Sequence, residues 1–223
     1  MYENIDMISC GNTNCYVIRG CGGDILIDTG EERSRNEIEM WLLNYDVKII
    51  VLTHGHNDHI GNAAYFSELF GAEVYINKAD YPLISDNLKR HFYTSGALGR
   101  IAAAMSKKTM EQKAEKFKVT RFVSDGDVIG SKYGIPCFIV GLDGHTKGSV
   151  GVYFGDDLYV GDAVMNVPYP SFPYICESPK AARATIDKIN VIRPKRIMCG
   201  HGDIISTEHN KAYANLFSRS NIL

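Results

Sequence analysis

The residues with the clearest chemical potential lie in one short segment, His54-x-His56-x-Asp58-His59. Its three imidazoles and one carboxylate are ligand types that Zn²⁺ and similar divalent ions accept. Because side chains alternate along an extended chain, His54 and His56 are expected to turn to the same side and share one ion. A helix is expected to follow and to direct Asp58 and His59 toward a second ion. The segment therefore predicts a metal site.

Three further candidate ligands lie far along the chain, each preceded by a glycine in a loop next to a predicted strand. They are His145, Asp162 and His201. Glycine lets the backbone pass close to a ligand. Each residue alone is weak evidence, since a single histidine after glycine more often only occupies a turn. Together with the first segment, and in this order, they predict one metal centre.

The ordered motifs resemble those of the metallo-β-lactamase-fold superfamily of metal-dependent hydrolases, which carry HxHxDH, a later histidine, a bridging aspartate and a final histidine. The segments 13–18 and 26–30 also look like the opening strands of that family. The resemblance spans Thr53 to His201, most of the chain. The ligand sets that it implies are His54, His56 and His145 for the first ion, Asp58, His59 and His201 for the second, and Asp162 as a bridge.

The resemblance also implies a dinuclear mechanism and its cofactors. Two metals that share a hydroxide would supply the nucleophile and polarise the substrate oxygen. Asp58 is the candidate catalytic residue, expected to orient that hydroxide and to move a proton. Seven ligands are more than one tetrahedral ion can use, so two ions are expected, with Zn²⁺ as the first candidate. Fe or Mn are alternatives because all ligands are nitrogen or oxygen. Asp28 and Asp203 are candidate partners for ring N–H groups, or simply carboxylates that cap turns.

The proline-rich and aromatic loop 167–174 follows the bridging aspartate and is a candidate wall of the substrate pocket. Its aromatic residues Tyr169, Phe172 and Tyr174 are the candidate substrate-binding residues. A packed surface loop is the alternative. The loops that flank the ligands contain only Lys147 as a basic residue, so an acyl substrate is expected over a phosphodiester. We therefore predict a glyoxalase II-like hydrolase of thioesters or lactones.

Other functions remain open from sequence. Within the same fold, the alternatives are a phosphodiesterase and a mononuclear iron dioxygenase acting on persulfides. The presence of Asp58, His59 and His201 favours two metals over one. A different class of alternative is a non-catalytic binding protein that metals only stabilise. Because only a short tail follows His201, the helical domain with which typical glyoxalase II enzymes bind substrate is not expected here. Cys199, where relatives commonly carry proline, is expected to be a buried, inert thiol rather than a metal-tuning group.

The elements that position these residues follow from apolar patterns. Predicted strands cover residues 24–28, 47–52, 74–76, 119–123, 135–140, 149–154, 158–160 and 196–199. Ser34 with Glu37 predicts a capping box and a helix whose inner face is Ile38, Trp41, Leu42 and Tyr45. Further helices are expected from Asp58 to about residue 70, from Ser178 with Ala182, Ile186 and Ile189 inward, and from about Thr207 with Tyr213, Leu216 and Phe217 inward.

Residues 78–118 are expected to form a helical insert. Ile101 and Met105 are predicted to be its partial core anchors, and its lysines a solvated face. These lysines are Lys107, Lys108, Lys113, Lys116 and Lys118. His91, in the same insert, is expected at the surface or near the mouth of the site. The two strand-rich halves, with helices outside each, predict one α/β (α+β) domain over residues 1–223, a four-layer αββα sandwich.

Composition limits the class of protein. The chain has 223 residues, 45% hydrophobic and 22% charged, with a net charge of −2. This near balance argues against nucleic acid as a partner and leaves a small-molecule substrate as the expected one. No apolar window approaches the ~20 residues of a membrane span. The acidic N-terminus lacks a signal-peptide pattern, so a cytoplasmic location is expected, with the six cysteines as thiols. Oligomeric state is left open.

Overall fold

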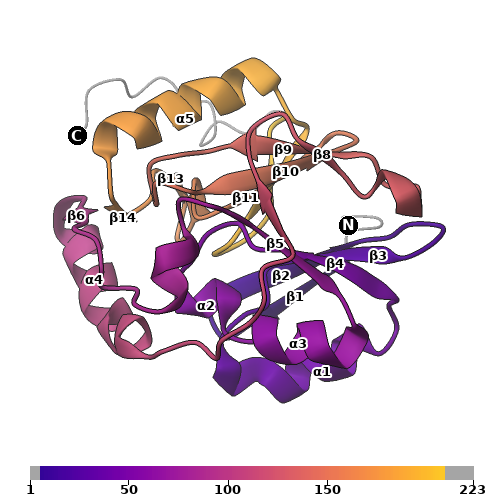
Figure 1. The fold of residues 1–223 in the computed structure, drawn as a ribbon. Coiled ribbons are helices and arrows are strands. Elements are labelled where there is room, and N and C mark those ends of the chain that lie inside the picture. Colours follow the sequence, from indigo (N-terminus) through magenta and orange to yellow (C-terminus); the bar gives the residue numbers. More distant parts are fainter. Residues whose placement is uncertain (1–5, 209–223) are drawn as a thin grey trace.

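In the computed structural model, two six-stranded sheets pack face to face with helices outside them (Figure 1). The structure describes residues 6–208, apart from the side chains of Leu98 and Lys108. The helix expected from about Thr207 extends beyond these residues, so its predicted face lies outside the described part of the chain. Within that part, no helix is long and apolar enough to cross a membrane.

The first sheet contains the N-terminal strands. In sheet order they are β1 (Asp6–Cys10), β2 (Thr13–Ile18), β3 (Asp24–Ile27), β4 (Val47–Val51), β5 (Glu73–Asn77) and β7 (Arg121–Val123). β2 pairs antiparallel with both β1 and β3, and the pairings from β3 through β7 are parallel. Parallel strands end at the same edge of a sheet, so the loops after β3 and β4 meet there.

The second sheet contains the C-terminal strands. In sheet order they are β16 (Ile205–Ser206), β15 (Arg196–Cys199), β11 (Asp157–Gly161), β10 (Val150–Phe154), β9 (Cys137–Gly141) and β8 (Val128–Ile129). Only β11 and β15 are parallel, and they place the loops of Asp162 and His201 side by side. Two short ribbons add to the structure: β12 (Met165–Asn166) with β13 (Pro170–Ser171), and β6 (Tyr93–Thr94) with β14 (Ile175–Cys176).

Three apolar clusters hold the layers together. The central cluster joins the facing sides of the two sheets, as with Ile27 and Val51 of the first sheet and Val152 and Met198 of the second. A second cluster lies between the first sheet and the helices α1 (Arg35–Leu42) and α3 (Ala63–Phe70). The third lies between the second sheet and α5 (Pro179–Ile192). The αββα sandwich expected from the sequence is confirmed.

Most predicted strands are confirmed to within a few residues, and so is the helix from Ser178. The Ser178 hydroxyl caps α5 by accepting from the backbone N–H of Ala181 at 3.2 Å. The predicted inner residues Ala182, Ile186 and Ile189 are buried. A polar cap before a regular apolar face therefore located this helix correctly.

The helix predicted after Ser34 is present as α1, with Ile38 and Leu42 buried, but its capping box and the extent of the next helix were predicted wrongly. Ser34 ends a short 3₁₀ turn, η1 (Glu32–Ser34), and its side chain makes no capping hydrogen bond to α1. The helix expected from Asp58 to about residue 70 is split into α2 (Asn57–Ile60) and α3, because Asn62 binds elsewhere. Its amide nitrogen donates to the carbonyls of Thr29 and Glu31, both at 2.8 Å, and ties the chain to the loop after β3.

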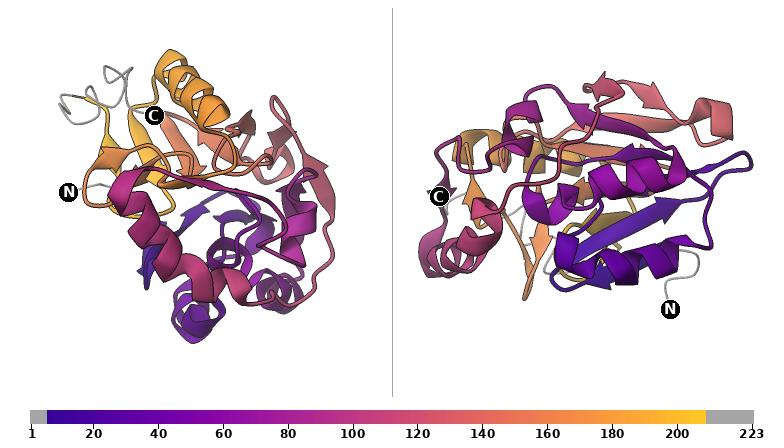
Figure 2. Two further views of the ribbon diagram at one scale, coloured as in Figure 1. Left: turned by 90° about the vertical axis from the view of Figure 1, so that its left-hand side faces the viewer. Right: turned by 60° about the horizontal axis from the view of Figure 1, so that its bottom comes forward.

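The insert contains a short 3₁₀ turn, η2 (Tyr81–Ile84), then β6 and the helix α4 (Gly96–Glu111). Figures 1 and 2 show α4 beside β6 and β14 at one end of the sandwich, away from the sheet faces. Ile101 and Met105 are 56% and 70% exposed, so the prediction that they anchor the core is wrong. The main contacts of the helix are with α2, β6 and β14, and among its described side chains that of Met110 is buried.

Candidate metal centre

All seven candidate ligands converge at one edge of the two sheets. His54, His56, Asp58 and His59 follow β4, and the others follow three strands of the second sheet. The groups whose ligand atoms all lie within 4.8 Å of one another are His54, His56 and His145; His54, His59 and Asp162; and Asp58, His59 and His201. The shared members place these groups side by side as one cluster.

The first group consists of three imidazoles whose nitrogens face one another. Nε2 of His145 lies 3.2 Å from Nε2 of His54 and 2.9 Å from Nδ1 of His56. Burial, and then the neighbouring imidazoles, lower the pKa of His54 well below its usual value. Burial and then His145 lower the pKa of His56 to about 3. These two rings are therefore neutral at pH 7 and present lone pairs to a cation.

The second group combines carboxylates with imidazoles. Nε2 of His201 lies 3.4 Å from Oδ2 of Asp58 and 3.3 Å from Oδ2 of Asp162. Asp162 also reaches the other side of the cluster, because its Oδ2 is 3.6 Å from Nε2 of His145 and its Oδ1 is 3.3 Å from Nε2 of His59. A carboxylate between both groups is the arrangement that a bridging ligand requires.

The histidines of the second group differ in protonation state from those of the first group. Burial alone would lower the pKa of His201, but the carboxylates of Asp162 and Asp58 outweigh it and raise that pKa to about 10. The pKa of His59 is likewise raised, because Asp28, Asp162 and Asp58 outweigh burial. The same pairs hold the pKa of Asp58 and of Asp162 below the usual range, against the effect of burial. Without metal, this group holds protons where ions would bind.

Three observations test whether divalent ions fit here. Nε2 of His59 and Oδ1 of Asp162 are buried and make no hydrogen bond within the described residues; the ion pair between them, at 3.3 Å, leaves both able to contact a cation. A Cβ at Gly200 would lie 2.5 Å from Oδ1 of Asp162, so only glycine leaves space at this point. The donors are imidazole nitrogens and carboxylate oxygens, which suit Zn²⁺, Fe and Mn. The residues fit two such ions.

Three of the rings, those of His59, His145 and His201, are oriented through their other nitrogen, as metal-binding histidines generally are. Nδ1 of His59 lies 2.8 Å from Oδ2 of Asp28, as expected for that carboxylate. Nδ1 of His145 lies 2.7 Å from the carbonyl of Ile175, and Nδ1 of His201 lies 2.5 Å from the carbonyl of Asn12. Asp203, the other carboxylate considered, is exposed, and its carbonyl accepts from Asn166.

Several residues that hold the ligand loops were missed by the sequence reasoning. The buried carboxylate of Asp80 accepts hydrogen bonds from the loops of His54 and His145. The side chain of Asn14 donates to the carbonyls of Cys199 and Gly202, on either side of His201. Neither residue belongs to a motif of metal ligands. The signal was only indirect, since Asn14 is a polar residue within a mainly apolar strand and Asp80 lies three residues after the end of β5.

The candidate substrate-binding residues differ in their surroundings. Tyr169 is half exposed. Phe172 packs against the apolar cluster beneath α5, and the hydroxyl of Tyr174 donates to the carbonyl of Val167. The carbonyl of Tyr174 accepts a hydrogen bond from the N–H of Ser95 at 2.9 Å, which joins this loop to the insert. Loop 167–174 and the start of α4 are therefore adjacent.

Three other residues singled out from the sequence lie outside the ligand cluster. Lys147 is exposed, and its backbone N–H donates to Glu177. His91 is exposed and its ring contacts that of Tyr93. Cys199 is fully buried, and burial followed by the charge of Asp162 raises the pKa of its thiol. A protonated thiol is a poor metal ligand, which agrees with the expectation that it is inert.

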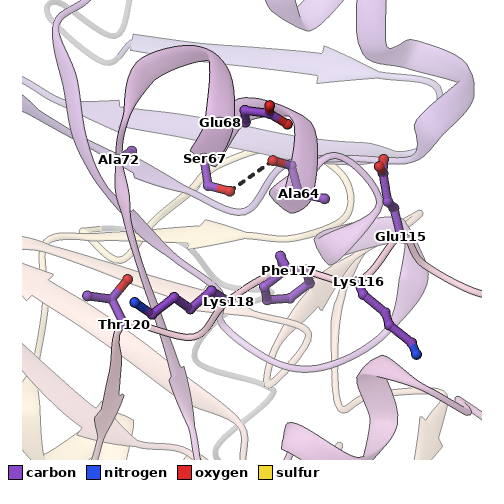
Figure 3. A pocket seen from close by; sticks show the side chains of 9 residues that line it. All are labelled: Ala64, Ser67, Glu68, Ala72, Glu115, Lys116, Phe117, Lys118 and Thr120. Carbon is purple, nitrogen blue, oxygen red and sulfur yellow. Dashed lines mark hydrogen bonds between the residues drawn. The ribbon is translucent and has the colours of Figure 1, made fainter.

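A hollow of about 320 Å³ lies away from the cluster, between α3 and the segment 115–120 (Figure 3). Its charged lining side chains are Glu68, Glu115, Lys116 and Lys118. None of the seven candidate ligands lines this hollow, and its mixed charge favours no particular ligand.

Comparison with known proteins agrees with this geometry. The sequence model of the metallo-beta-lactamase superfamily matches residues 8–201. Hydroxyacylglutathione hydrolase GloC of Haemophilus influenzae is 27% identical over 144 residues, 61% of this chain and 61% of that protein. The match thus spans about three fifths of the length of the Haemophilus protein. The probable metallo-hydrolase YflN of Bacillus subtilis is 24% identical over 203 residues, 80% of this chain and 75% of that one.

Solved structures share the fold. A metallo-beta-lactamase family protein from Thermus thermophilus has a TM-score of 0.71 and 21% identity, covering 97% of this chain and 78% of its own. TTHA1623, crystallised in a di-iron-bound form, has a TM-score of 0.64 and 23% identity. The match covers 96% of this chain and 98% of that one. At these identities the likeness concerns the fold.

Proposed function

Because this chain belongs to the metallo-beta-lactamase superfamily, we propose that it is a metal-dependent hydrolase with two divalent ions at the sheet edge. His54, His56 and His145 would hold one ion, and Asp58, His59 and His201 the other. The observation that carries this proposal is the position of Asp162, within 3.6 Å of His145 and within 3.3 Å of both His59 and His201. Asp162 could also be a ligand of a single ion, together with His54 and His59, but a carboxylate that reaches both groups is the one that two ions would share.

Zn²⁺ is the first candidate metal, and iron is the second, as in the di-iron form of TTHA1623. When bound, the ions supply Lewis acidity and lower the pKa of a water toward neutrality. Asp58 then holds or moves a proton at its carboxylate, which is partly exposed beside His201 and charged at neutral pH. The oriented rings keep the ligand nitrogens in place during this transfer.

For the substrate, we propose a thioester or a lactone. The name of the Haemophilus relative, a hydroxyacylglutathione hydrolase, supports a thioester. An acyl substrate also suits this site better than a phosphate ester. Enzymes that cleave phosphate esters normally place cationic side chains near the metals to bind the negative charge. The nearby Lys147 is exposed, and Arg90 is already bound to Asp80 and Glu177. We assign Tyr169, Phe172 and Tyr174 to the wall against which the substrate packs.

The test is a panel of substrates on one metal-loaded preparation. S-lactoylglutathione, a homoserine lactone, a β-lactam and bis-p-nitrophenyl phosphate represent four classes of bond. We expect the thioester or lactone to exceed the phosphodiester by at least about tenfold in kcat/KM, about 1.4 kcal/mol of transition-state preference. Fastest turnover of the phosphodiester would overturn the acyl assignment. Uptake of oxygen with a persulfide substrate would instead favour the dioxygenase.

The number of ions is tested separately. Elemental analysis of the purified protein should give close to two ions per chain, and His59→Ala should give close to one. One ion per chain in both proteins would contradict the two-metal proposal. Two ions with no turnover on any of these substrates would favour the binding protein.

A further inference from the structure

Two ligand loops meet on one buried carboxylate, that of Asp80, which follows β5 in the insert. Its Oδ2 accepts from the N–H of Gly55, between His54 and His56, at 3.0 Å. The same oxygen accepts from the hydroxyl of Thr146, next to His145, at 2.6 Å. Its Oδ1 accepts from the N–H of Gly148 at 2.9 Å. One side chain thus joins the loop of the first sheet to the loop of the second.

The burial of this carboxylate requires a reason. Asp80 is 0% exposed, and a buried charge is costly unless hydrogen bonds and an opposite charge compensate for it. Three donors from the ligand loops and Nη1 of Arg90, at 3.1 Å, supply that compensation. Since Gly55 and Thr146 are adjacent to histidines of the first group and Gly148 lies in the loop of His145, the contacts of Asp80 are directed at the loops of those ligands.

Close packing supports the same conclusion. A Cβ at Gly148 would lie 2.7 Å from Oδ1 of Asp80, and a Cβ at Gly55 would lie 2.9 Å from its carbonyl oxygen. Real Cβ atoms do not approach so closely, so both glycines are needed for the loops to reach this residue. The two loops therefore lie directly against Asp80, with no side chain between.

The outer side of this junction is also fixed. Arg90 bridges Asp80 to the carboxylate of Glu177, with Nη1 at 2.9 Å from Oε1. Glu177 in turn holds the loop of His145 twice: its Oε2 accepts from the N–H of Lys147 at 2.9 Å, and its own N–H donates to the carbonyl of His145 at 2.9 Å. The His145 loop is thus held from two directions.

We propose that Asp80 is a positioning residue for the first metal site. Its carboxylate sets the separation of the His54–His56 loop from the His145 loop, so that their ring nitrogens converge before an ion binds. Through Asp80, the insert contributes to the geometry of the metal centre. The proposal rests on the metal centre under the proposed function, but it does not depend on which substrate is cleaved.

The experiment compares Asp80→Asn with the wild type and with Asp187→Asn. Asparagine keeps the size of the side chain but replaces one acceptor oxygen with an amide group that cannot accept. Asp187 lies on α5 and is 66% exposed, so it controls for loss of a charge. Two quantities are measured: Zn²⁺ affinity by titration against a chelating dye, and hydrogen exchange of the Gly55 and Gly148 amides in the metal-free protein by NMR.

We expect Asp80→Asn to weaken at least one of the two Zn²⁺ binding constants roughly ten- to a hundredfold. We also expect faster exchange at one or both glycine amides, with Asp187→Asn like the wild type. Zn²⁺ constants within twofold of the wild type would overturn the proposal, whether or not exchange changes. Weaker Zn²⁺ binding with unchanged exchange would also overturn it, since the effect would not act through the loops.

If Asp80→Asn does not fold, Thr146→Val decides the question. Valine has nearly the same shape as threonine but lacks the hydroxyl that donates to Asp80. Weaker Zn²⁺ binding in this folded variant supports the proposal, and unchanged binding overturns it. A wild-type protein that binds two Zn²⁺ ions but cleaves none of the tested substrates would contradict the proposed hydrolase while leaving this comparison valid.

Discussion

Oδ2 of Asp28 lies 2.8 Å from Nδ1 of His59, and both side chains are buried. The same carboxylate accepts from the N–H and the hydroxyl of Thr53, both at 2.8 Å, just before His54. One side chain therefore orients a ligand of the second group and fixes the start of the segment that carries the first. Because Nδ1 of His59 faces Asp28, its Nε2 points to Asp162 and toward an ion.

Asp28→Asn is expected to weaken the binding of the second ion. Asp28 has a left-handed φ of 59°, which asparagine tolerates, so the backbone can be kept. A neutral amide orients His59 less well than a carboxylate, and we expect roughly ten- to a hundredfold weaker binding of one ion. Elemental analysis after dialysis against a chelator measures this loss. Asp46→Asn, at an exposed position, is the control, and two ions retained equally in both variants would refute the prediction.

Proton release should distinguish the two groups. His56, with its pKa lowered to about 3, is neutral at pH 7, whereas His201, with its pKa raised to about 10, holds a proton in the metal-free protein. An ion must displace that proton. Binding of the second ion is therefore expected to tighten as pH rises from 7 to 10, with little change for the first. Calorimetry in buffers of different ionisation enthalpy measures the protons released, and none released at pH 7.5 would contradict this.

The same pKa shifts predict how the stability of the metal-free protein depends on pH. The raised pKa of His201 stabilises the fold fully below 6.5, and this contribution is lost as pH rises through about 10. The lowered pKa of His56 acts oppositely: its contribution is lost as pH falls from 6.5 toward 3. Urea unfolding of chelator-treated protein should give lower stability at pH 9 and at pH 4.5 than at pH 6.5. A steady rise in stability from pH 6.5 to 9 would show this assignment to be wrong.

Much of the site could be predicted from sequence because its ligands belong to distinctive residue types at fixed spacing. Buried strands such as β4 and β15 were also predictable, since each is a short and mainly apolar segment. The position of Asp80 was not, because its partners Thr146 and Gly148 lie 66 and 68 positions further along the chain. A single aspartate in a loop carries no local pattern that indicates such contacts.

The errors in the insert have a related cause. Ile101 and Met105 have the spacing of one helical face, but spacing does not say whether anything covers that face. The two-residue strands β6 and β14 are too short to show any alternation. Their pairing nevertheless matters for the site, because β14 contains Ile175, whose carbonyl orients His145. Short tertiary pairings of this kind are visible only in the structure.

Cys199→Ala should keep both ions and most of the activity. The thiol is fully buried with a raised pKa, and the histidine and aspartate ligands are complete without it. The small cavity left behind is expected to cost on the order of 1 kcal/mol of unfolding free energy. Elemental analysis and the substrate assay check both points together. Loss of one ion in this variant would make the thiol a ligand.

Asp58→Asn separates proton transfer from metal binding at the second group. The carboxylate of Asp58 lies 3.4 Å from His201 and is partly exposed, so it can reach both the ion and an entering substrate. Asparagine keeps the shape but cannot take up a proton, and we expect kcat to fall by roughly 10²–10⁴. Because Asp58 is also a candidate ligand, Zn²⁺ content must be measured on the same preparation. A large fall in kcat with two ions still bound assigns the loss to proton transfer, and a fall that Zn²⁺ restores assigns it to binding. If kcat stays within threefold of the wild type with both ions present, Asp58 does not transfer the proton. Another group near the ions must then do so.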